Sequence, residues 1–428
     1  MRKEIMLNRF AENIGMNRTV LALSIARLGD AVGNSILFIV IPLYVAKLPS
    51  PLFPFQESVR VGILISLYGV VNSLFQPVMG ALSDKLGRRK LFIQLGLLIM
   101  GLSTFSFIYA NHFLNLLLLR ALQGIGVALT IPASMALMAT ATQKNTRGGS
   151  MGVYSTMRMM GFAIGPLIGG SLFDRYGFNI AFIAGTAFIL LGFFMVQLWV
   201  KELPPKPSER PVGKIRIIDP KLLSIGIIGA GIATFIMASD FSMISALENL
   251  INTKLNETAL EFGIAFSALM VGRMVFQVPL GRWSDRIGRK PLIIGGLILM
   301  APATILLGEV ATTFQFVSVR VVQGIASAAI AAPAFALAAD LSKAGGEGRQ
   351  MSIITMGFGL GIAFGPLMAG ILAVPSFALP FLIGGILTFL AAWIVHRYVP
   401  ETVESESSEK QAAETRVSIQ KRDSESSG

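Results

Sequence analysis

A charged ten-residue turn occurs twice in this chain and constrains its fold more than any other feature. The segment GALSDKLGRR at 80–89 returns 201 positions later as GRWSDRIGRK at 281–290, and each copy lies between two long apolar runs. Duplication inside an apolar chain is typical of membrane proteins built from internal repeats. We therefore predict two copies of one membrane unit, each with the same charged turn between two of its spans.

The composition indicates a membrane protein. Apolar residues make up 53% of the chain and charged residues only 14%, whereas a soluble domain carries about a quarter charged residues. The charges gather at the ends of runs of roughly 20 residues, the length that crosses about 30 Å of hydrocarbon. We predict an all-α membrane protein with twelve spans, at approximately 20–45, 59–83, 90–110, 112–140, 149–173, 178–200, 222–247, 259–283, 291–311, 313–340, 349–374 and 377–398.

Basic residues favour one side of these spans. Eighteen lysines and arginines lie in the loops that also hold the repeated turns, and four lie in the opposite loops, namely Lys47, Arg60, Arg175 and Lys254. By the positive-inside rule the first set of loops is cytoplasmic, as are both termini. The net charge of +12 is thus explained by topology, without a nucleic-acid partner.

Several kinds of chemistry are excluded. The chain has no cysteine, and its two histidines, His112 and His396, are predicted near opposite ends of the molecule, so we expect no disulfide and no metal site. No Gly-x4-Gly-Lys-Ser/Thr phosphate loop occurs, which excludes ATP hydrolysis by that route. The sequence GGSMG at 148–152 fits a hydrolase pattern but lies in a basic loop that neither histidine can reach. We predict no enzyme activity and no cofactor.

The repeat extends over both halves of the chain. Gln76 matches Gln277 and Arg120 matches Arg320, and the offset of 200 or 201 predicts halves nearly free of relative insertions. The region between the halves is rich in proline and charge, as in a solvated linker, and the last residues are rich in Ser and Glu, as in a disordered tail. The predicted organisation is a cytoplasmic segment at 1–19, a six-helix bundle at 20–200, a linker at 201–221, a second bundle at 222–398 and a tail at 399–428.

These features together resemble the major facilitator superfamily. The resemblance rests on two six-span repeats, the turn Gly-x-x-x-Asp-Lys/Arg-x-Gly-Arg-Arg/Lys after the second span of each, and Arg-x-x-Gln-Gly at 120–124, and it covers residues 20–400. The glycine-proline sequence at 161–170 is similar to a motif of the superfamily's drug:proton antiporters. The resemblance implies two pseudo-symmetric six-helix bundles and secondary active transport by alternating access.

The repeated turns are candidate gates. In the superfamily's arrangement, span 2 meets span 11 and span 8 meets span 5, so Asp84 and Asp285 would each face the positive N-terminal end of an opposing helix. This contact would close the cytoplasmic side, although the basic residues of the turns also serve to anchor the topology. The predicted gating residues are Gly80, Asp84, Arg88, Arg89, Gly281, Asp285, Arg289 and Lys290.

Glycines recur every four residues in spans 5 and 11, with a proline in each series. Small residues at this spacing share one helix face and let backbones pack closely, while proline bends the helix. We expect packing and hinge roles for Gly161, Gly165, Pro166, Gly169, Gly361, Gly365 and Pro366.

Charge inside the spans is the sharper functional signal, since an ionisable group near the midplane costs at least about 2.5 kcal/mol. Arg27, Asp30 and Asn34 share one face of span 1, with Asp30 roughly 15 Å from the cytoplasmic end. The resemblance also implies a role, because twelve-span drug antiporters commonly carry an acid in span 1. Asp30 is our first candidate for proton coupling. The alternative is a permanent Arg27–Asp30 pair that only fixes packing.

Other intramembrane charges complete the set. Asp240 lies in the outer part of span 7, either as a functional carboxylate or simply solvated. The resemblance ties Arg120 to proton coupling through nearby carboxylates. Substrate and ion chemistry can be asymmetric where architecture is repeated, which singles out positions where the halves differ. The predicted coupling and cavity residues are Asp30, Arg27, Asn34, Arg120, Arg158, Asp240, Arg273 and Arg320.

We therefore expect a proton-coupled exporter of small amphipathic or drug-like compounds in a prokaryotic cell membrane, working as a monomer with protons, a small-molecule substrate and the lipid bilayer as partners. One alternative is a proton symporter or facilitator that imports an organic solute. Five intramembrane arginines against two aspartates suit an anionic substrate and favour this alternative. A non-transporting membrane sensor and a lipid flippase also stay open.

Overall fold

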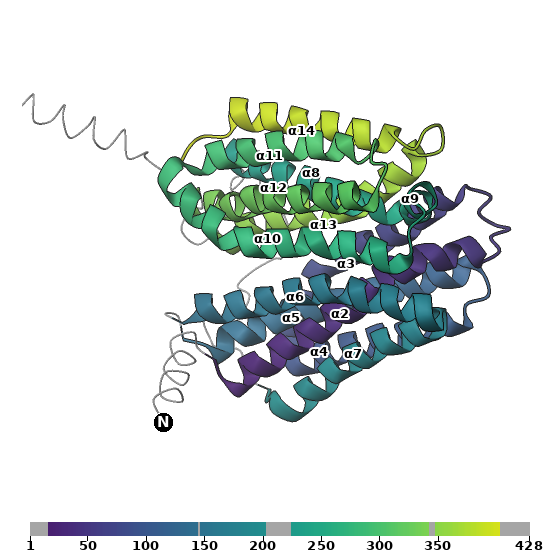
Figure 1. Cartoon of the computed structure of the whole chain (residues 1–428). Helices are drawn as coiled ribbons and strands as arrows, with labels where there is room; N and C mark the ends of the chain where they lie inside the picture. Colours follow the sequence, from purple (N-terminus) through teal and green to yellow (C-terminus); the bar gives the residue numbers. More distant parts are fainter. Residues whose placement is uncertain (1–15, 144–145, 203–223, 342–346, 403–428) are drawn as a thin grey trace, which may run out of the picture.

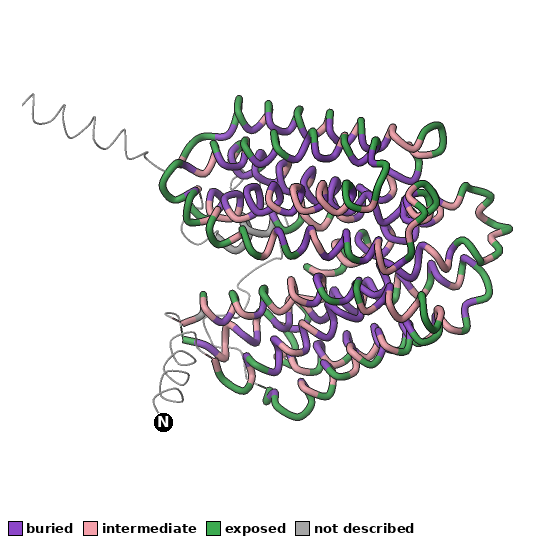
Figure 2. Tube along the Cα trace, viewed as in Figure 1, coloured by how far each residue is buried: buried purple, intermediate pink, exposed green. Residues whose placement is uncertain are grey.

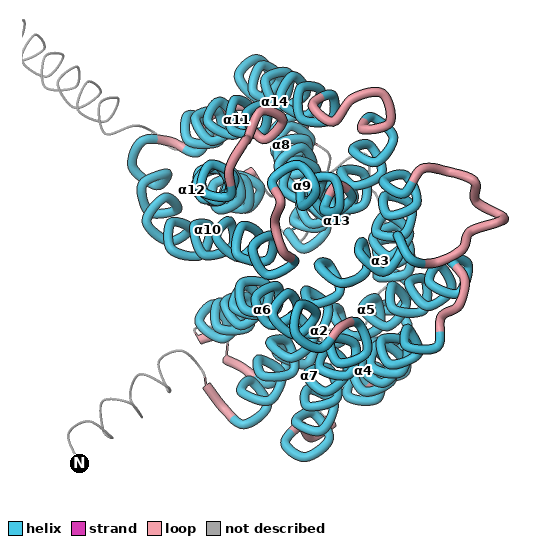
Figure 3. The backbone as a smooth tube through the Cα atoms, turned by 45° about the vertical axis from the view of Figure 1, so that its right-hand side comes forward, coloured by secondary structure: helices cyan, strands magenta, loops and turns pink. Residues whose placement is uncertain are grey.

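A computed structural model describes residues 16–143, 146–202, 224–341 and 347–402. The predicted terminal segment, linker and tail fall largely outside these residues. Within them the regular elements are helices, joined by short loops (Figure 3). The long helices are α2 (Arg18–Lys47), α3 (Glu57–Leu86), α4 (Arg89–Ser106), α5 (Phe113–Ala141), α6 (Arg147–Tyr176), α7 (Phe178–Trp199), α8 (Ile225–Ser242), α10 (Ala259–Ile287), α11 (Arg289–Leu306), α12 (Thr313–Asp340), α13 (Glu347–Leu372) and α14 (Leu379–Tyr398). Short helices are η1 (Phe107–Tyr109), η4 (Met243–Ala246) and α9 (Glu248–Leu255).

The long helices form two bundles of six, α2 to α7 and α8 to α14, that lie side by side (Figure 1). In the described residues, eleven of these helices are long and apolar enough to cross a membrane. The twelfth, α6, is 30 residues long and packs between α2 and α10, with Arg158 in its interior. The predicted all-α fold is confirmed. Helices α2 and α8 are the most deeply buried of the spans, as Figure 2 shows in purple.

The charged turns owe their geometry to glycine. Gly87 ends α3 with φ 63° and Gly288 ends α10 with φ 108°, backbone conformations that side chains with a Cβ disfavour. The next helix starts at once in both halves, and a carboxylate from the end of the bundle accepts its first N–H groups. Glu202 accepts from the backbone N–H of Lys90 at 2.9 Å, and Glu401 accepts from that of Lys290 at 3.0 Å. A carboxylate at a helix N-terminus stabilises it through these bonds and the helix dipole.

The predicted constant offset is wrong for the first helix of each half. Gly161 of α6 packs on Leu28 and Ala31 of α2, and Gly361 of α13 packs on Phe235 and Ala238 of α8 in the same way. The equivalent residues of α2 and α8 are therefore 207 positions apart, since α2 starts at 18 and α8 at 225. The cause is a longer loop in the first half, where 48–56 joins α2 to α3 and 256–258 joins α9 to α10.

The bundles pack closely against each other at one end of the seam between them and diverge at the other. We call the end with the charged turns the motif end and the opposite end, with α9, the sealed end. At the sealed end Gly62 of α3 lies against the carbonyl oxygen of Pro366, and Gly263 of α10 lies against that of Pro166; an added Cβ would come within 2.6 Å in both cases. Toward the motif end the bundles diverge (Figure 1), and an added Cβ at Gly152 would meet no atom within 4 Å.

Candidate functional site

The strongest candidate for a functional site is a buried ion pair near the middle of α2, formed by Arg27 and Asp30. The Nη1 atom of Arg27 lies 2.5 Å from Oδ2 of Asp30, and these residues are only 7% and 4% exposed. One turn is enough to bring them together, because residues three apart in a helix are neighbours. Asp30 is twelve residues into a 30-residue helix. A buried pair of this kind is costly to break from one side, because the remaining charge is left uncompensated.

Aromatic residues of neighbouring helices surround this pair. The Arg27 guanidinium lies over the ring of Tyr154 in α6, 5.7 Å from its centroid. Asn34 donates from Nδ2 to the hydroxyl of Tyr68 in α3 at 2.8 Å. The predicted face of Arg27, Asp30 and Asn34 therefore meets α3 and α6, the two helices of this half that pack most extensively against the other half.

The repeated arginines of α5 and α12 lie inside their own bundles, and Arg120 also lies over the ring of Tyr68, 5.4 Å from its centroid. Arg120 donates to Gln123 at 3.0 Å, and Gln123 donates to Thr104 of α4 at 2.8 Å. The second half repeats this chain of hydrogen bonds through Arg320, Gln323 and Thr304 at 2.7 and 3.0 Å. Both arginines are at most 1% exposed. Their guanidiniums tie two helices of one bundle together, an arrangement that the predicted cavity role did not anticipate.

Asp240 also lies inside a bundle, and the solvated alternative is wrong. Its exposure is 1%, and its Oδ2 accepts hydrogen bonds from Thr304 of α11 at 3.1 Å and from Thr388 of α14 at 2.5 Å. It thus joins the network of Arg320 through the shared Thr304. Helices α11 and α14 belong to the second bundle, so the carboxylate faces away from the seam.

Two arginines without a carboxylate partner face the seam itself. Arg158 of α6 and Arg273 of α10 lie over the same ring, that of Phe358 in α13, at 5.9 and 5.3 Å from its centroid. Arg158 also lies 5.6 Å from the ring centroid of Phe162. Both side chains are half-buried. The structure therefore brings together two predicted cavity residues from opposite halves.

In this conformation the charged residues of each turn pair with residues of their own bundle. Asp84 accepts from Arg89 at 2.8 Å, and Arg89 also donates to Thr140 of α5 at 2.6 Å. In the second half Arg289 pairs with Asp285 and, at 3.3 Å, with Asp340 of α12. These contacts are within one bundle.

Other members of the predicted gate also face their own half or solvent. Gly80 faces Pro132 of α5, and Gly281 faces Ala332 of α12, so each of these glycines packs within its own half. Arg88 is exposed. The contact between Asp84 and the opposite half stays a prediction for a conformation in which the motif end is shut.

The glycine series packs the helices within each half. A Cβ added to Gly165 would lie 1.9 Å from Oγ of Ser35, and one added to Gly169 would lie 3.0 Å from Cα of Ile36, both in α2. Gly361 and Gly365 face α8 in the same manner, with backbone oxygens at 2.2 and 2.3 Å. Pro166 and Pro366 lie at the sealed seam, where their carbonyl groups meet glycines across it.

Sequence reasoning missed a buried acid at the sealed end, Glu248, the first residue of α9. It is 0% exposed, and neither of its carboxylate oxygens has a hydrogen-bond partner in the described residues. Its neighbour Asn249 donates to Pro42 of α2 at 3.4 Å and to Glu57 of α3. Burial, and secondly the Asp174 carboxylate, raise the pKa of Glu248 well above its usual range. The only sequence signal was a carboxylate directly after an apolar run.

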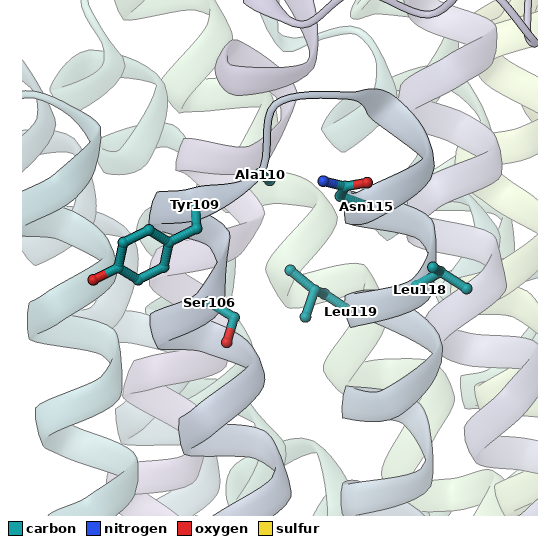
Figure 4. Close-up of a pocket in the computed structure, with 6 residues that line it drawn as sticks. All are labelled: Ser106, Tyr109, Ala110, Asn115, Leu118 and Leu119. Carbon is teal, nitrogen blue, oxygen red and sulfur yellow. The ribbon is translucent and has the colours of Figure 1, made fainter.

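The pocket in Figure 4 lies apart from these groups. It has none of the predicted site residues in its lining, which comes from α4, η1, the loop after η1 and α5 near the sealed end: Ser106, Tyr109, Ala110, Asn115, Leu118 and Leu119. Among the described residues no cluster of three or more His, Asp or Glu side chains could hold a metal ion. The chemistry available at the seam is therefore that of the ion pair and the two unpaired arginines.

Comparison with known families agrees with this architecture. The sequence profile of the Major Facilitator Superfamily matches residues 23–227 and 230–424. The chain belongs to the Major Facilitator Superfamily. It is accordingly a membrane transporter and not an enzyme.

Its relatives include multidrug transporters. The chain is 28% identical over 343 residues to the multidrug resistance protein MdtG of Escherichia coli (strain 55989 / EAEC), covering 78% of this chain and 83% of that protein. It is 25% identical over 324 residues to the multi-drug resistance efflux pump PmrA of Streptococcus pneumoniae serotype 4, covering 74% and 79%.

Solved structures share the fold. A bacterial homologue of the human lysosomal transporter Spinster, in an inward-facing and occupied conformation, superposes with a TM-score of 0.74 at 15% identity, over 88% of this chain and 95% of that one. The human organic anion transporter MFSD10 superposes with a TM-score of 0.59 at 19% identity, over 88% and 99%. At these identities the likeness concerns the fold alone.

Proposed function

We propose that this transporter exports small amphipathic compounds from the cell in exchange for protons. The observation that carries the proposal is the buried Arg27–Asp30 pair on the helix face that meets the seam-forming helices α3 and α6. The multidrug function named for the relatives supports drug-like cargo. Because the sequence has no phosphate loop, the energy source in this proposal is an ion gradient.

The ion pair offers a simple coupling step. When Asp30 is ionised, it neutralises Arg27 and the pair is satisfied. When a proton binds Asp30, the Arg27 guanidinium loses its counter-charge in a buried setting, which costs several kcal/mol, about 3–5 for a broken buried pair. Rearrangement of the helices or release of the cargo then lowers the free energy of the site. In this proposal, proton and cargo therefore occupy the site in turn.

The orientation follows from charge. The motif end carries most of the loop lysines and arginines, so the positive-inside rule assigns it to the cytoplasm, with both termini on the same side. The structure then corresponds to a state closed toward the outside, and the membrane would be the cytoplasmic membrane of a prokaryote. The proposed working unit is the monomer, because each chain holds both halves of the seam.

Import of an anionic solute together with protons is the second candidate. It is favoured by Arg158 and Arg273, the two seam arginines without a carboxylate partner. The two candidates differ in the direction of proton flow relative to the solute, which one assay reads.

The assay uses purified protein in liposomes loaded with a pH-sensitive dye. Ethidium added as cargo should drive protons in the opposite direction under export by exchange. Protons that move with the solute would contradict it and favour import. Asp30→Asn should abolish solute-driven proton flux.

A matched control separates coupling from folding. The double variant Arg27→Gln with Asp30→Asn removes both charges and leaves no uncompensated ion. It should fold better than Asp30→Asn alone and still lack proton coupling. Normal coupling in the double variant would remove Asp30 from the proposed role.

A further inference from the structure

The two unpaired arginines at the seam, Arg158 and Arg273, form a candidate binding site for an anion. Arg158 and Arg273 come from opposite bundles and share the ring of Phe358. Among the described residues, neither guanidinium takes part in a hydrogen bond or an ion pair, and the buried Nε of Arg273 lacks any partner. The charges near Arg158 are Arg27, Arg273 and Asp30. Since Arg27 is already paired with Asp30, two positive charges are left over.

Two unpaired positive charges at this depth are unfavourable unless they have a function. An unpaired arginine at membrane depth costs about 2.5–3.5 kcal/mol, and unlike Arg120 and Arg320 these two have no glutamine to hold them. Arg158 is eleven residues into α6 and Arg273 fourteen residues into α10, so both lie near the middle of their helices. The repeat supplies no architectural reason either, because the equivalent residues are Phe358 and Asn72.

The way the arginines are held leaves their hydrogen-bonding edges free. An aromatic ring binds a guanidinium through its flat face, and this contact uses none of the in-plane N–H donors. Those donors match a carboxylate, sulfonate or phosphate, often through two parallel bonds. The ring of Phe358 lies beside both arginines and that of Phe162 beside Arg158. The Phe162 ring is followed by those of Phe38 and Phe266, with successive centroids 6.2 and 6.0 Å apart. Charge and apolar surface thus adjoin.

We propose, on the basis of transport in either of the two modes above, that the cargo is an amphiphile with one anionic group, held between Arg158 and Arg273 while its apolar body lies against Phe162 and Phe358. The anion bridges the two halves, because each arginine belongs to a different bundle. Asp30 is a negative charge near Arg158, so a proton on Asp30 strengthens binding of the anion. An anionic cargo therefore favours movement together with the proton, the second candidate above.

The test measures binding and needs no gradient. Purified full-length protein in phosphatidylcholine nanodiscs is titrated at one pH with 8-anilinonaphthalene-1-sulfonate and with N-phenyl-1-naphthylamine, which has the same rings without the sulfonate; empty nanodiscs are subtracted. Arg158→Gln or Arg273→Asn should weaken sulfonate binding by about tenfold or more, the size of a charged hydrogen bond, and change binding of the uncharged amine less than about twofold. Ethidium, a cation, should bind more tightly to both variants.

Controls keep the outcome specific. Arg273→Asn installs the residue that the first half has at the same place, so the fold has a precedent for it. Arg175→Gln changes an exposed arginine on the same helix as Arg158 and should leave all three probes unaffected. Equal weakening of the sulfonate and the amine would show that the arginines only shape the cavity and would overturn the proposal, as would unchanged sulfonate binding. Selective loss of sulfonate binding in a protein that shows no proton exchange would uphold the site and reject the transport mode.

Discussion

We predict that Glu248 makes the sealed end sensitive to pH. Its carboxyl is fully buried without a hydrogen-bond partner, and α9 contacts α2 across the seam. Asn249 ties the same turn to Glu57 of α3. Parting the bundles at this end must break that tie and bring Glu248 to water. Its titratable neighbour is Asp174 at the end of α6, whose carboxylate also accepts from the backbone N–H of Leu260 at 2.9 Å.

The sign follows from linkage. Burial, with Asp174 as a secondary cause, raises the pKa of Glu248 in the sealed state, whereas in water a glutamate has a pKa of about 4.3. The sealed state therefore binds one more proton than the parted state between these two values. The seal is fully favoured below about pH 4.3 and weakens as the pH rises toward the raised pKa. For one proton the ratio of sealed to parted molecules falls about tenfold per pH unit in that window, about 1.4 kcal/mol.

Distance measurements can follow this equilibrium. The chain has no cysteine, so Tyr109→Cys and Phe314→Cys can be spin-labelled at exposed positions of the two halves near the sealed end. In nanodiscs, the long-distance population should grow by the stated factor as the pH is raised. Glu248→Gln, a neutral side chain of the same size, should keep the short distance at every pH. Glu309→Gln, an exposed acid at the same end, is the control and should behave as the parent protein. An unchanged pH response in Glu248→Gln would refute the reasoning.

Three further predictions concern packing, capping and the gate. Gly165→Ala places a Cβ 1.9 Å from Oγ of Ser35 and should lower the free energy of unfolding by about 1–3 kcal/mol, seen as a lower Tm. Gly152→Ala, whose Cβ meets no atom within 4 Å, should leave the Tm unchanged, and equal effects of the two variants would contradict the packing geometry. Glu401→Ala removes the acceptor for the first N–H groups of α11 and should cost about 0.5–2 kcal/mol of unfolding free energy, and an unaltered denaturant midpoint would reject the cap. Asp84→Asn should weaken closure of the motif end by about 0.3–2 kcal/mol, so that a maleimide labels Gly152→Cys faster; an unchanged rate would leave the turn as an anchor only.

The spans could be predicted because their cause is local. A run of apolar residues long enough to cross the bilayer is visible in the sequence, and so is the turn whose glycines, Gly87 and Gly288, take a positive φ. The contacts that each helix face makes with neighbouring helices could not be predicted in this way. Nothing in the sequence showed that Gln123 would hold Arg120, or that Asp240 would turn toward Thr388 and away from the seam, because both depend on which face of a helix its neighbours cover.

The register of the first helices failed for a related reason. The offset of 200 or 201 came from identical residues in the two halves, such as Gln76 and Gln277. Loop lengths vary more freely than the elements that the loops connect. Packing shows the true offset of 207 through Gly161 and Gly361. At this register, with 207 added or subtracted, Asp30 is equivalent to Met237, and Glu248 is equivalent to Ile41. Each acid is thus present in only one half.

Arg158 and Phe358 show why the halves must differ at the centre. They are equivalent positions of the repeat, 200 apart, and they lie against each other across the seam, 5.9 Å from guanidinium carbon to ring centroid. A residue next to the axis that relates the halves meets its own counterpart, so a strictly repeated arginine would place two like charges face to face in a poorly solvated setting. With Phe358 in one half, the same position gives a cation–π contact, and Arg273 can join the same ring. Repetition can therefore build the seal, whereas a binding site on the axis requires that the repeat be broken there.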